Sequence, residues 1–162
     1  FIMYNFELGE SLNSFAIGLA IRSHNMYSNS RIQDIKGDTI KIEVIPDEID
    51  YRRTKINPVY LDLPVEIKLR TSKGFKIGLG LKVGYLLDSK EKYQGNRPSD
   101  NYNVKTKSKD IRWMEDWVFG GTFRIGYKWV SAFAYYQFTR IFESGRGPEM
   151  YPLSVGITIT PF

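Results

Sequence analysis

Apolar and polar side chains alternate along residues 75–87, "FKIGLGLKVGYLL". Every second residue from Phe75 to Leu87 is large and apolar, and the residues between them are mostly glycine or lysine. Successive side chains of a strand point to opposite faces of its sheet. The pattern therefore predicts a strand about twice the usual length, with one face that is entirely apolar.

Other segments repeat this alternation. They are residues 1–8, 14–22, 58–70, 116–128, 130–140 and 151–162. In the less regular segment 130–140, the apolar face is assigned to Val130, Ala132, Ala134, Tyr136 and Phe138. Pro64 lies inside a predicted strand, where proline cannot donate a ladder hydrogen bond, so we expect a bulge there.

The connections between these segments alternate in length. The short ones are 9–13, 71–74 and 128–130, and the long ones are 23–56, 88–115 and 141–150. In an up-and-down antiparallel sheet, alternate connections lie at the same end, so the short turns and the long loops are predicted to gather at opposite ends. Bacterial outer-membrane barrels have this asymmetry, with short periplasmic turns and long extracellular loops.

The strand count predicts about eight strands in one domain spanning residues 1–162. Seven segments alternate and single-chain bacterial barrels have even strand numbers, so we expect one strand upstream of Phe1, in a chain that is processed or truncated. Residues 38–45 also alternate. We assign them to a hairpin within the first long loop; the alternative is an eighth spanning strand.

Composition narrows the classes of protein. The chain has no cysteine, which excludes disulfides, thiol catalysis and cysteine metal sites. Its mean hydropathy is −0.34 and no apolar run is long enough for a transmembrane helix. A membrane barrel tolerates such a composition because only alternate residues face lipid. The net charge of +5 permits contact with anionic lipid.

Aromatic residues are predicted to form two girdles on the apolar face. Ten residues separate Phe75 from Tyr85 and also Trp117 from Tyr127, a climb of about 25 Å along a tilted strand. The expected periplasmic row is Phe15, Phe75, Tyr127, Trp129 and Phe162, and the outer row is Tyr85, Trp117, Tyr136, Phe138 and Tyr151. The alternative is a soluble lipocalin-like ligand-binding barrel, whose apolar residues would face inward.

Charged residues on the opposite face are predicted to form a network inside the barrel. Its members are Asp62, Glu66, Lys68, Lys82 and Arg124. We expect Asp62 opposite Lys82 and Glu66 diagonal to Lys76. An eight-stranded interior is filled by side chains, so its charges must pair. The near balance of charge favours a plugged interior over an open pore.

Residues 57–162 resemble the PorT-like outer-membrane β-barrels of Bacteroidetes. The resemblance rests on "YLDLPVEIKLR", on "FKIGLGLKVGYLL" and on the closing "YPLSVGITITPF". The matching residues are Tyr60, Leu61, Pro64, Lys68, Gly84, Tyr85, Leu86 and Leu87. The resemblance implies an eight-stranded barrel with a cleaved signal peptide, and some relatives take part in type IX protein secretion.

No catalytic, metal or cofactor site is predicted. His24 follows Ser23, but no acidic third member lies nearby and no Gly-x-Ser-x-Gly elbow exists. The acidic clusters 47–50 and 115–116 lack calcium-loop spacing. We expect a non-enzymatic outer-membrane protein with a structural, surface-interaction or secretion-accessory role; the alternative is an outer-membrane lipid-modifying enzyme.

Membrane lipid is the expected partner, and other outer-membrane or secretion proteins are further candidates. The basic segment 89–110 could bind lipopolysaccharide phosphates, through residues that include Lys92, Arg97 and Lys107, or could simply be a solvated loop. Nucleic acid is not expected, because these basic residues lie in a loop between membrane strands. The long loops are expected outside the cell and the C-terminus in the periplasm.

Overall fold

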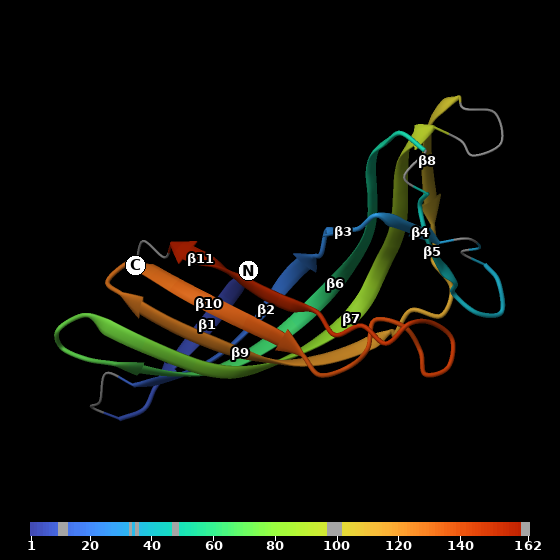
Figure 1. Ribbon diagram of the computed structural model, residues 1–162. Coiled ribbons are helices and arrows are strands. Elements are labelled where there is room, and N and C mark those ends of the chain that lie inside the picture. Colours follow the sequence, from blue (N-terminus) through green and yellow to red (C-terminus); the bar gives the residue numbers. More distant parts are fainter. Residues whose placement is uncertain (10–12, 33, 35, 47–48, 97–101, 160–162) are drawn as a thin grey trace.

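The computed structural model describes residues 1–9, 13–32, 34, 36–46, 49–96 and 102–159, and the fold is all-β (Figure 1). The strands are β1 (Ile2–Glu7), β2 (Ser14–Ser23), β3 (Met26–Tyr27), β4 (Ser30–Ile32), β5 (Ile42–Val44), β6 (Tyr51–Arg70), β7 (Phe75–Asn96), β8 (Asn103–Lys109), β9 (Trp117–Tyr127), β10 (Val130–Gln137) and β11 (Leu153–Ile159). Within the described ranges, no helix is long and apolar enough to cross a membrane.

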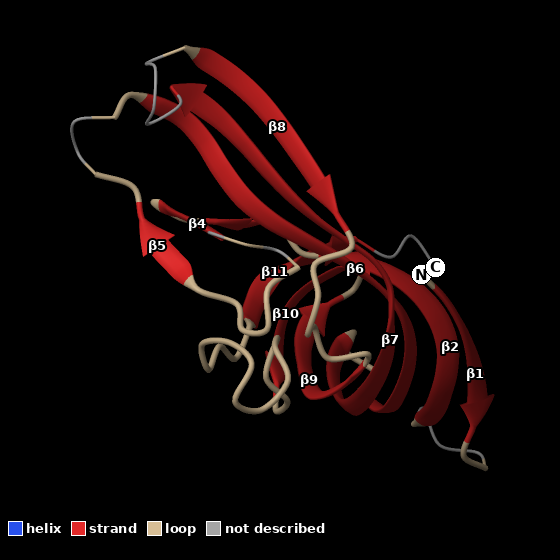
Figure 2. Cartoon of the chain, turned by 90° about the vertical axis from the view of Figure 1, so that its right-hand side faces the viewer, coloured by secondary structure: helices blue, strands red, loops and turns tan. Residues whose placement is uncertain are grey.

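The main sheet has the predicted up-and-down topology. Its order is β1-β2-β6-β7-β9-β10-β11, and every neighbouring pair is antiparallel. The sheet curves strongly, and Figure 2 shows the strands wrapping around a common interior. The strands β1 and β11 end this order. A further strand upstream of Phe1 remains a prediction.

The first long loop contains the predicted hairpin. β5 pairs with β4 in a separate two-stranded sheet, so residues 38–45 do not supply a spanning strand. In Figure 1 the end of β1, the start of β2 and the turns that join β6 to β7 and β9 to β10 lie together at the left, and the described parts of the long connections lie at the other end. The sorting of loops by length is therefore confirmed.

The β6–β7 turn determines the register of the central hairpin. The backbone N–H of Thr71 donates to the Phe75 carbonyl at 2.9 Å, and that of Gly74 donates to the Thr71 carbonyl at 3.0 Å. Gly74 has φ 90°, a left-handed conformation that glycine adopts without a Cβ clash. Arg70 consequently pairs with Lys76, two residues away from the register expected from the sequence.

Both central strands are longer than predicted. β6 has 20 residues and β7 has 22, and their outer parts run through segments expected to be loop. These parts and β8 form a three-stranded extension that projects from the curved sheet (Figure 1). A bulge at Leu87 shifts the pairing, because Tyr60 pairs with Leu86 while Val59 pairs with Asp88.

The expected bulge at Pro64 is absent. Pro64 pairs in register with Lys82 of β7, whereas on its other side the β2–β6 pairing is interrupted between Ile17–Val65 and Ala20–Asp62 without a change of register. The ladder therefore accommodates the missing proline N–H by an interruption next to β2 and keeps the strand in phase.

The long loops form an apolar cluster of their own. Its buried members are Ile32, Ile40, Ile56, Ile111, Met114, Ile141 and Phe142. The β4–β5 hairpin is tied to β7 because the Ile32 N–H donates to Glu91 Oε1 at 2.7 Å. Met114 and Phe142 form a β-bridge between two loops. The conventional hydrophobic core thus lies in the loops, beyond the curved part of the sheet.

Candidate functional site

The two faces of the curved sheet have opposite chemistry. Ile77, Leu79 and Leu81 are 42%, 57% and 64% exposed, whereas Asp62 and Gln137 on the inner face are fully buried. A soluble barrel would have the reverse arrangement, since contiguous exposed apolar surface of this extent is rare on soluble monomers. The apolar face therefore requires an apolar surrounding.

Aromatic side chains on the apolar face meet in pairs near the two ends of the strands. Phe75 and Tyr127 have ring centroids 5.0 Å apart, and so do Tyr85 and Trp117 at the other end of the β7–β9 pairing. Tyr136 and Phe138 are 5.8 Å apart. Trp129 and Tyr151 are exposed, Phe15 is half-buried, and Phe162 lies outside the described residues. Their role as membrane girdles remains a prediction.

Glycines on the inner face make room for large polar side chains from neighbouring strands. A Cβ at Gly84 would lie 2.5 Å from Asp62 Oδ1, and one at Gly120 would lie 2.4 Å from the Tyr135 ring. These close approaches explain why the alternating strands carry glycine on the inner face, where other strands carry larger polar side chains. A side chain at these positions would displace the interior groups described next.

An ion cluster fills the interior near the long loops. The Arg22 guanidinium donates twice to the buried Asp62 carboxylate, at 2.7 and 3.0 Å, and Lys82 Nζ lies 3.7 Å from the same carboxylate. The guanidinium carbon lies 4.6 Å from the Tyr60 ring centre and 4.7 Å from that of Tyr135. Asp62 therefore neutralises two cations that aromatic faces also stabilise.

Sequence reasoning identified Asp62 and Lys82 in this cluster but missed Arg22, Tyr60 and Tyr135. Arg22 alternates in phase with the polar face of its segment, so the signal was present. The tyrosines carried the same signal, because Tyr60 is in phase with Asp62 and Tyr135 lies between the outward-assigned Ala134 and Tyr136. Both lie on the inner face, where they are 1% and 2% exposed.

His24 caps the cluster as a neutral acceptor. Its Nε2 contacts the Arg22 guanidinium, and its backbone N–H donates to the Pro58 carbonyl at 3.1 Å. Burial, with Arg22 beside it, lowers the pKa of His24 from 6.5 to about 4. Ser23 makes a different contact, accepting from Asn57 Nδ2 at 2.8 Å. Ser23 and His24 thus contact different residues.

A second ion pair lies deeper in the interior, toward the short turns. Arg124 Nη2 lies 3.2 Å from Glu66 Oε1, and Lys68 Nζ donates to Asn5 Oδ1 at 2.8 Å. Glu66 pairs across the ladder with Gly80, so the expected diagonal contact with Lys76 is wrong.

Asp62 likewise pairs with Gly84, not with Lys82, and reaches Lys82 diagonally. Both corrections arise from the Gly74 turn, which moves the register by two residues. A shift by two residues does not change which face of the sheet a side chain occupies, so all members of the network remain on the inner face.

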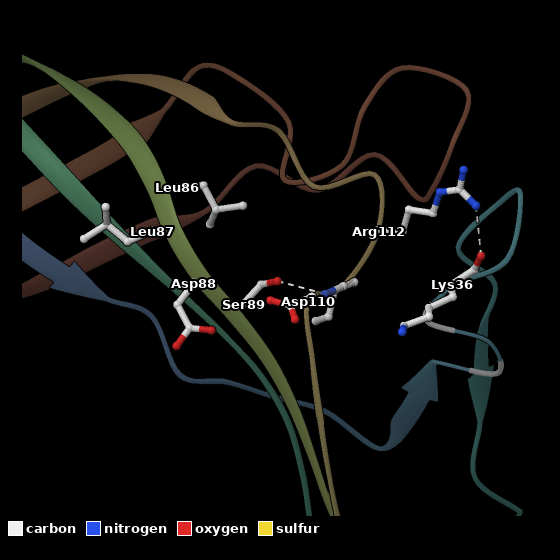
Figure 3. A pocket seen from close by; sticks show the side chains of 8 residues that line it. Lys36, Leu86, Leu87, Asp88, Ser89, Asp110 and Arg112 are labelled. Atoms are coloured by element: carbon white, nitrogen blue, oxygen red, sulfur yellow. Dashed lines mark hydrogen bonds between the residues drawn. The ribbon is translucent and has the colours of Figure 1, made fainter.

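A cleft of about 510 Å³ lies beside the bulge, between β7 and two long loops (Figure 3). Ser89 Oγ accepts from the Ile111 N–H at 2.9 Å, and Arg112 donates to the Lys36 carbonyl at 3.2 Å. These hydrogen bonds hold the loops together. Across the described parts of the chain, no group of three or more His, Asp and Glu side chains could hold a metal ion.

The comparison with protein families decides the class. The family model described as an outer membrane protein beta-barrel domain matches residues 2–143. The chain belongs to this outer-membrane β-barrel family. No curated protein and no solved structure gave a significant match. Membership agrees with the exposed apolar face, and the soluble lipocalin-like alternative is not supported. The protein is an outer-membrane barrel, and Ile77, Leu79 and Leu81 lie on its exposed apolar face.

Proposed function

We propose that this outer-membrane barrel is a non-enzymatic member of the PorT-like group, acting as a structural, surface-interaction or secretion-accessory component. The observation that carries the proposal is the filled interior: Tyr60, Asp62, Tyr135 and Gln137 are all nearly or fully buried. A barrel whose interior is occupied by paired side chains has no space for a wide aqueous channel. Because channel function is disfavoured, the proposed role is at the cell surface or with other proteins.

Conductance provides the direct test of a filled interior. The purified protein, reconstituted in a planar bilayer, is expected to show no steady ion current. The Asp62→Ala/Tyr135→Ala variant provides the comparison, because it empties part of the interior. A stable open current through the unmodified protein would contradict the proposal.

The proposed orientation places the long loops outside the cell and the C-terminus in the periplasm. The chain has no native cysteine, so single cysteines report their own location. Ser144→Cys lies in a long loop and Ser72→Cys in a short turn, and both positions are exposed. On intact cells, a membrane-impermeant maleimide should label the first and spare the second. Labelling of only Ser72→Cys would invert the topology.

The accessory role rests on the resemblance of residues 57–162 to PorT-like proteins. Mild-detergent extraction of the tagged protein from its native membrane should recover defined outer-membrane or secretion proteins in fixed ratio. Recovery of the barrel alone, after cross-linking, would favour a structural role in the membrane.

The enzyme alternative requires a nucleophile and base near the outer rim. The contacts of His24 with Arg22 and of Ser23 with Asn57 support the non-enzymatic proposal. We expect no hydrolysis of phospholipid or lipopolysaccharide. Activity that disappears in His24→Ala, while the variant still folds, would establish the enzyme.

A further inference from the structure

The outward surface of the central hairpin changes from apolar to polar and basic at the Leu87 bulge. Below it, the outward residues of β7 are odd-numbered and apolar, ending at Tyr85 and Leu87. The shift at Leu87 moves the even-numbered residues to this face, and the odd-numbered Ser89, Glu91 and Tyr93 become buried. In β6 the phase is continuous, so Lys55 lies on the same face as Leu61.

The outward face of the extension is strongly basic. Its cations, called here the basic face, are Arg53, Lys55, Lys92, Lys105, Lys107 and Lys109. Lys55, Lys92 and Lys107 pair directly across three adjacent strands. Like charges in directly opposed positions repel, which is destabilising without counter-charge.

Few groups on the protein neutralise this face. Within the described ranges, Asp88 pairs with Lys90, but no ion pair involves Lys92, Lys105 or Lys107. A groove of about 150 Å³ runs beside these three lysines and Arg53. The opposite face of the extension is not available, because Thr54, Ile56 and Tyr93 are buried.

We propose that the basic face binds the phosphate groups of lipopolysaccharide in the outer leaflet. Three observations support this ligand. The face continues the outward surface of the same two strands; it lies on the long-loop side of the Tyr85–Trp117 aromatic pair; and it carries unneutralised charge that suits phosphate.

Protection of an exposed sheet edge is the competing explanation for lysines on β8, because edge lysines discourage strand pairing between molecules. It does not account for Lys92, which lies on the central strand of the extension between β6 and β8. The two explanations also differ in what they predict for lipid binding.

The test compares two variants that lose the same charge. The protein, folded in zwitterionic detergent, is titrated with fluorescent lipopolysaccharide carrying phosphorylated lipid A. The Lys92→Gln/Lys105→Gln/Lys107→Gln variant should bind roughly 10- to 100-fold more weakly, since each lysine near an anionic lipid surface contributes severalfold. The control, Lys36→Gln/Lys41→Gln/Lys73→Gln, removes exposed lysines elsewhere and should bind within about twofold of wild type.

Heat-modifiable gel mobility confirms that each variant is folded. The single substitution Lys107→Glu, at an exposed position, provides a second variant that changes only one residue. Dephosphorylated lipid A should bind as weakly as the triple variant. Equal losses in the two triple variants, equal binding of the dephosphorylated lipid, or tighter binding of a soluble acidic polysaccharide would each overturn the proposal. None of these outcomes would alter the filled interior or the proposed function.

Discussion

Removing the Asp62 carboxylate should cost far more stability than removing an equally close carboxylate at the surface. Asp62 and Glu149 each lie 2.7 Å from an arginine nitrogen, but their side chains are 0% and 61% exposed. In Asp62→Ala, Arg22 and Lys82 remain inside the barrel with side chains only 12% and 17% exposed and no carboxylate between them.

The expected magnitude follows from the burial of these cations. Unit charges about 4 Å apart interact by about 4 kcal/mol at an effective dielectric constant of 20. Desolvation of the ions offsets part of this, and measured losses from breaking one side of a buried pair are about 3–5 kcal/mol. We therefore expect Asp62→Ala to lower the free energy of unfolding by about that amount.

Equilibrium unfolding in urea, from lipid vesicles and followed by tryptophan fluorescence and gel mobility, measures this loss. Glu149→Ala is the matched control and should show no measurable change, because water already solvates the exposed pair. In Arg22→Met/Asp62→Ala/Lys82→Met the charges are removed together, so stability should largely return. A loss below about 1 kcal/mol in Asp62→Ala would refute the reasoning, because the interior would then be solvating its cations with water.

Two further changes test the interior. Gly84→Ala should destabilise the barrel by about 1–3 kcal/mol, because the new methyl group overlaps Asp62, whereas Gly78→Ala in the same strand meets Arg124 Cβ at an ordinary 3.4 Å and should be tolerated; equal urea midpoints would contradict this. For His24, whose folded pKa of about 4 lies below its ordinary 6.5, the unfolded chain binds a proton first. The contribution of His24 to the free energy of unfolding should therefore be fully present above pH 6.5, decrease as the pH falls toward 4, and stay constant below that. The difference between wild type and His24→Gln isolates this dependence, and a flat difference would show that the ring is solvated.

Local alternation was sufficient to predict the strands of the curved sheet and their faces. In segments such as 75–87, each residue's parity determines which face it occupies, so no knowledge of the partner strand is needed. The loop lengths then predicted the topology, because alternate connections of an up-and-down sheet lie at the same end. The inward position of Asp62, Lys82 and Arg124 followed from the same parity.

The alternation did not predict that β6 and β7 continue into the three-stranded extension. Residues 51–57 and 88–96 are polar on the outward face, as a solvated loop would be, and their strand structure depends on pairing with each other and with β8. Their buried face contacts distant loops, through the packing of Ile56 in the loop cluster and through the hydrogen bond from the Ile32 N–H to Glu91.

The sequence by itself determined which side chains face lipid and which face inward, because that choice repeats at every second residue. The tertiary structure decided which charges meet. Pairing depends on local events: the left-handed Gly74 turn moves the register by two residues and preserves the alternation, whereas the Leu87 bulge moves it by one and exchanges the faces beyond it. Arg22, forty positions from Asp62, became its closest partner only when β2 lay beside β6.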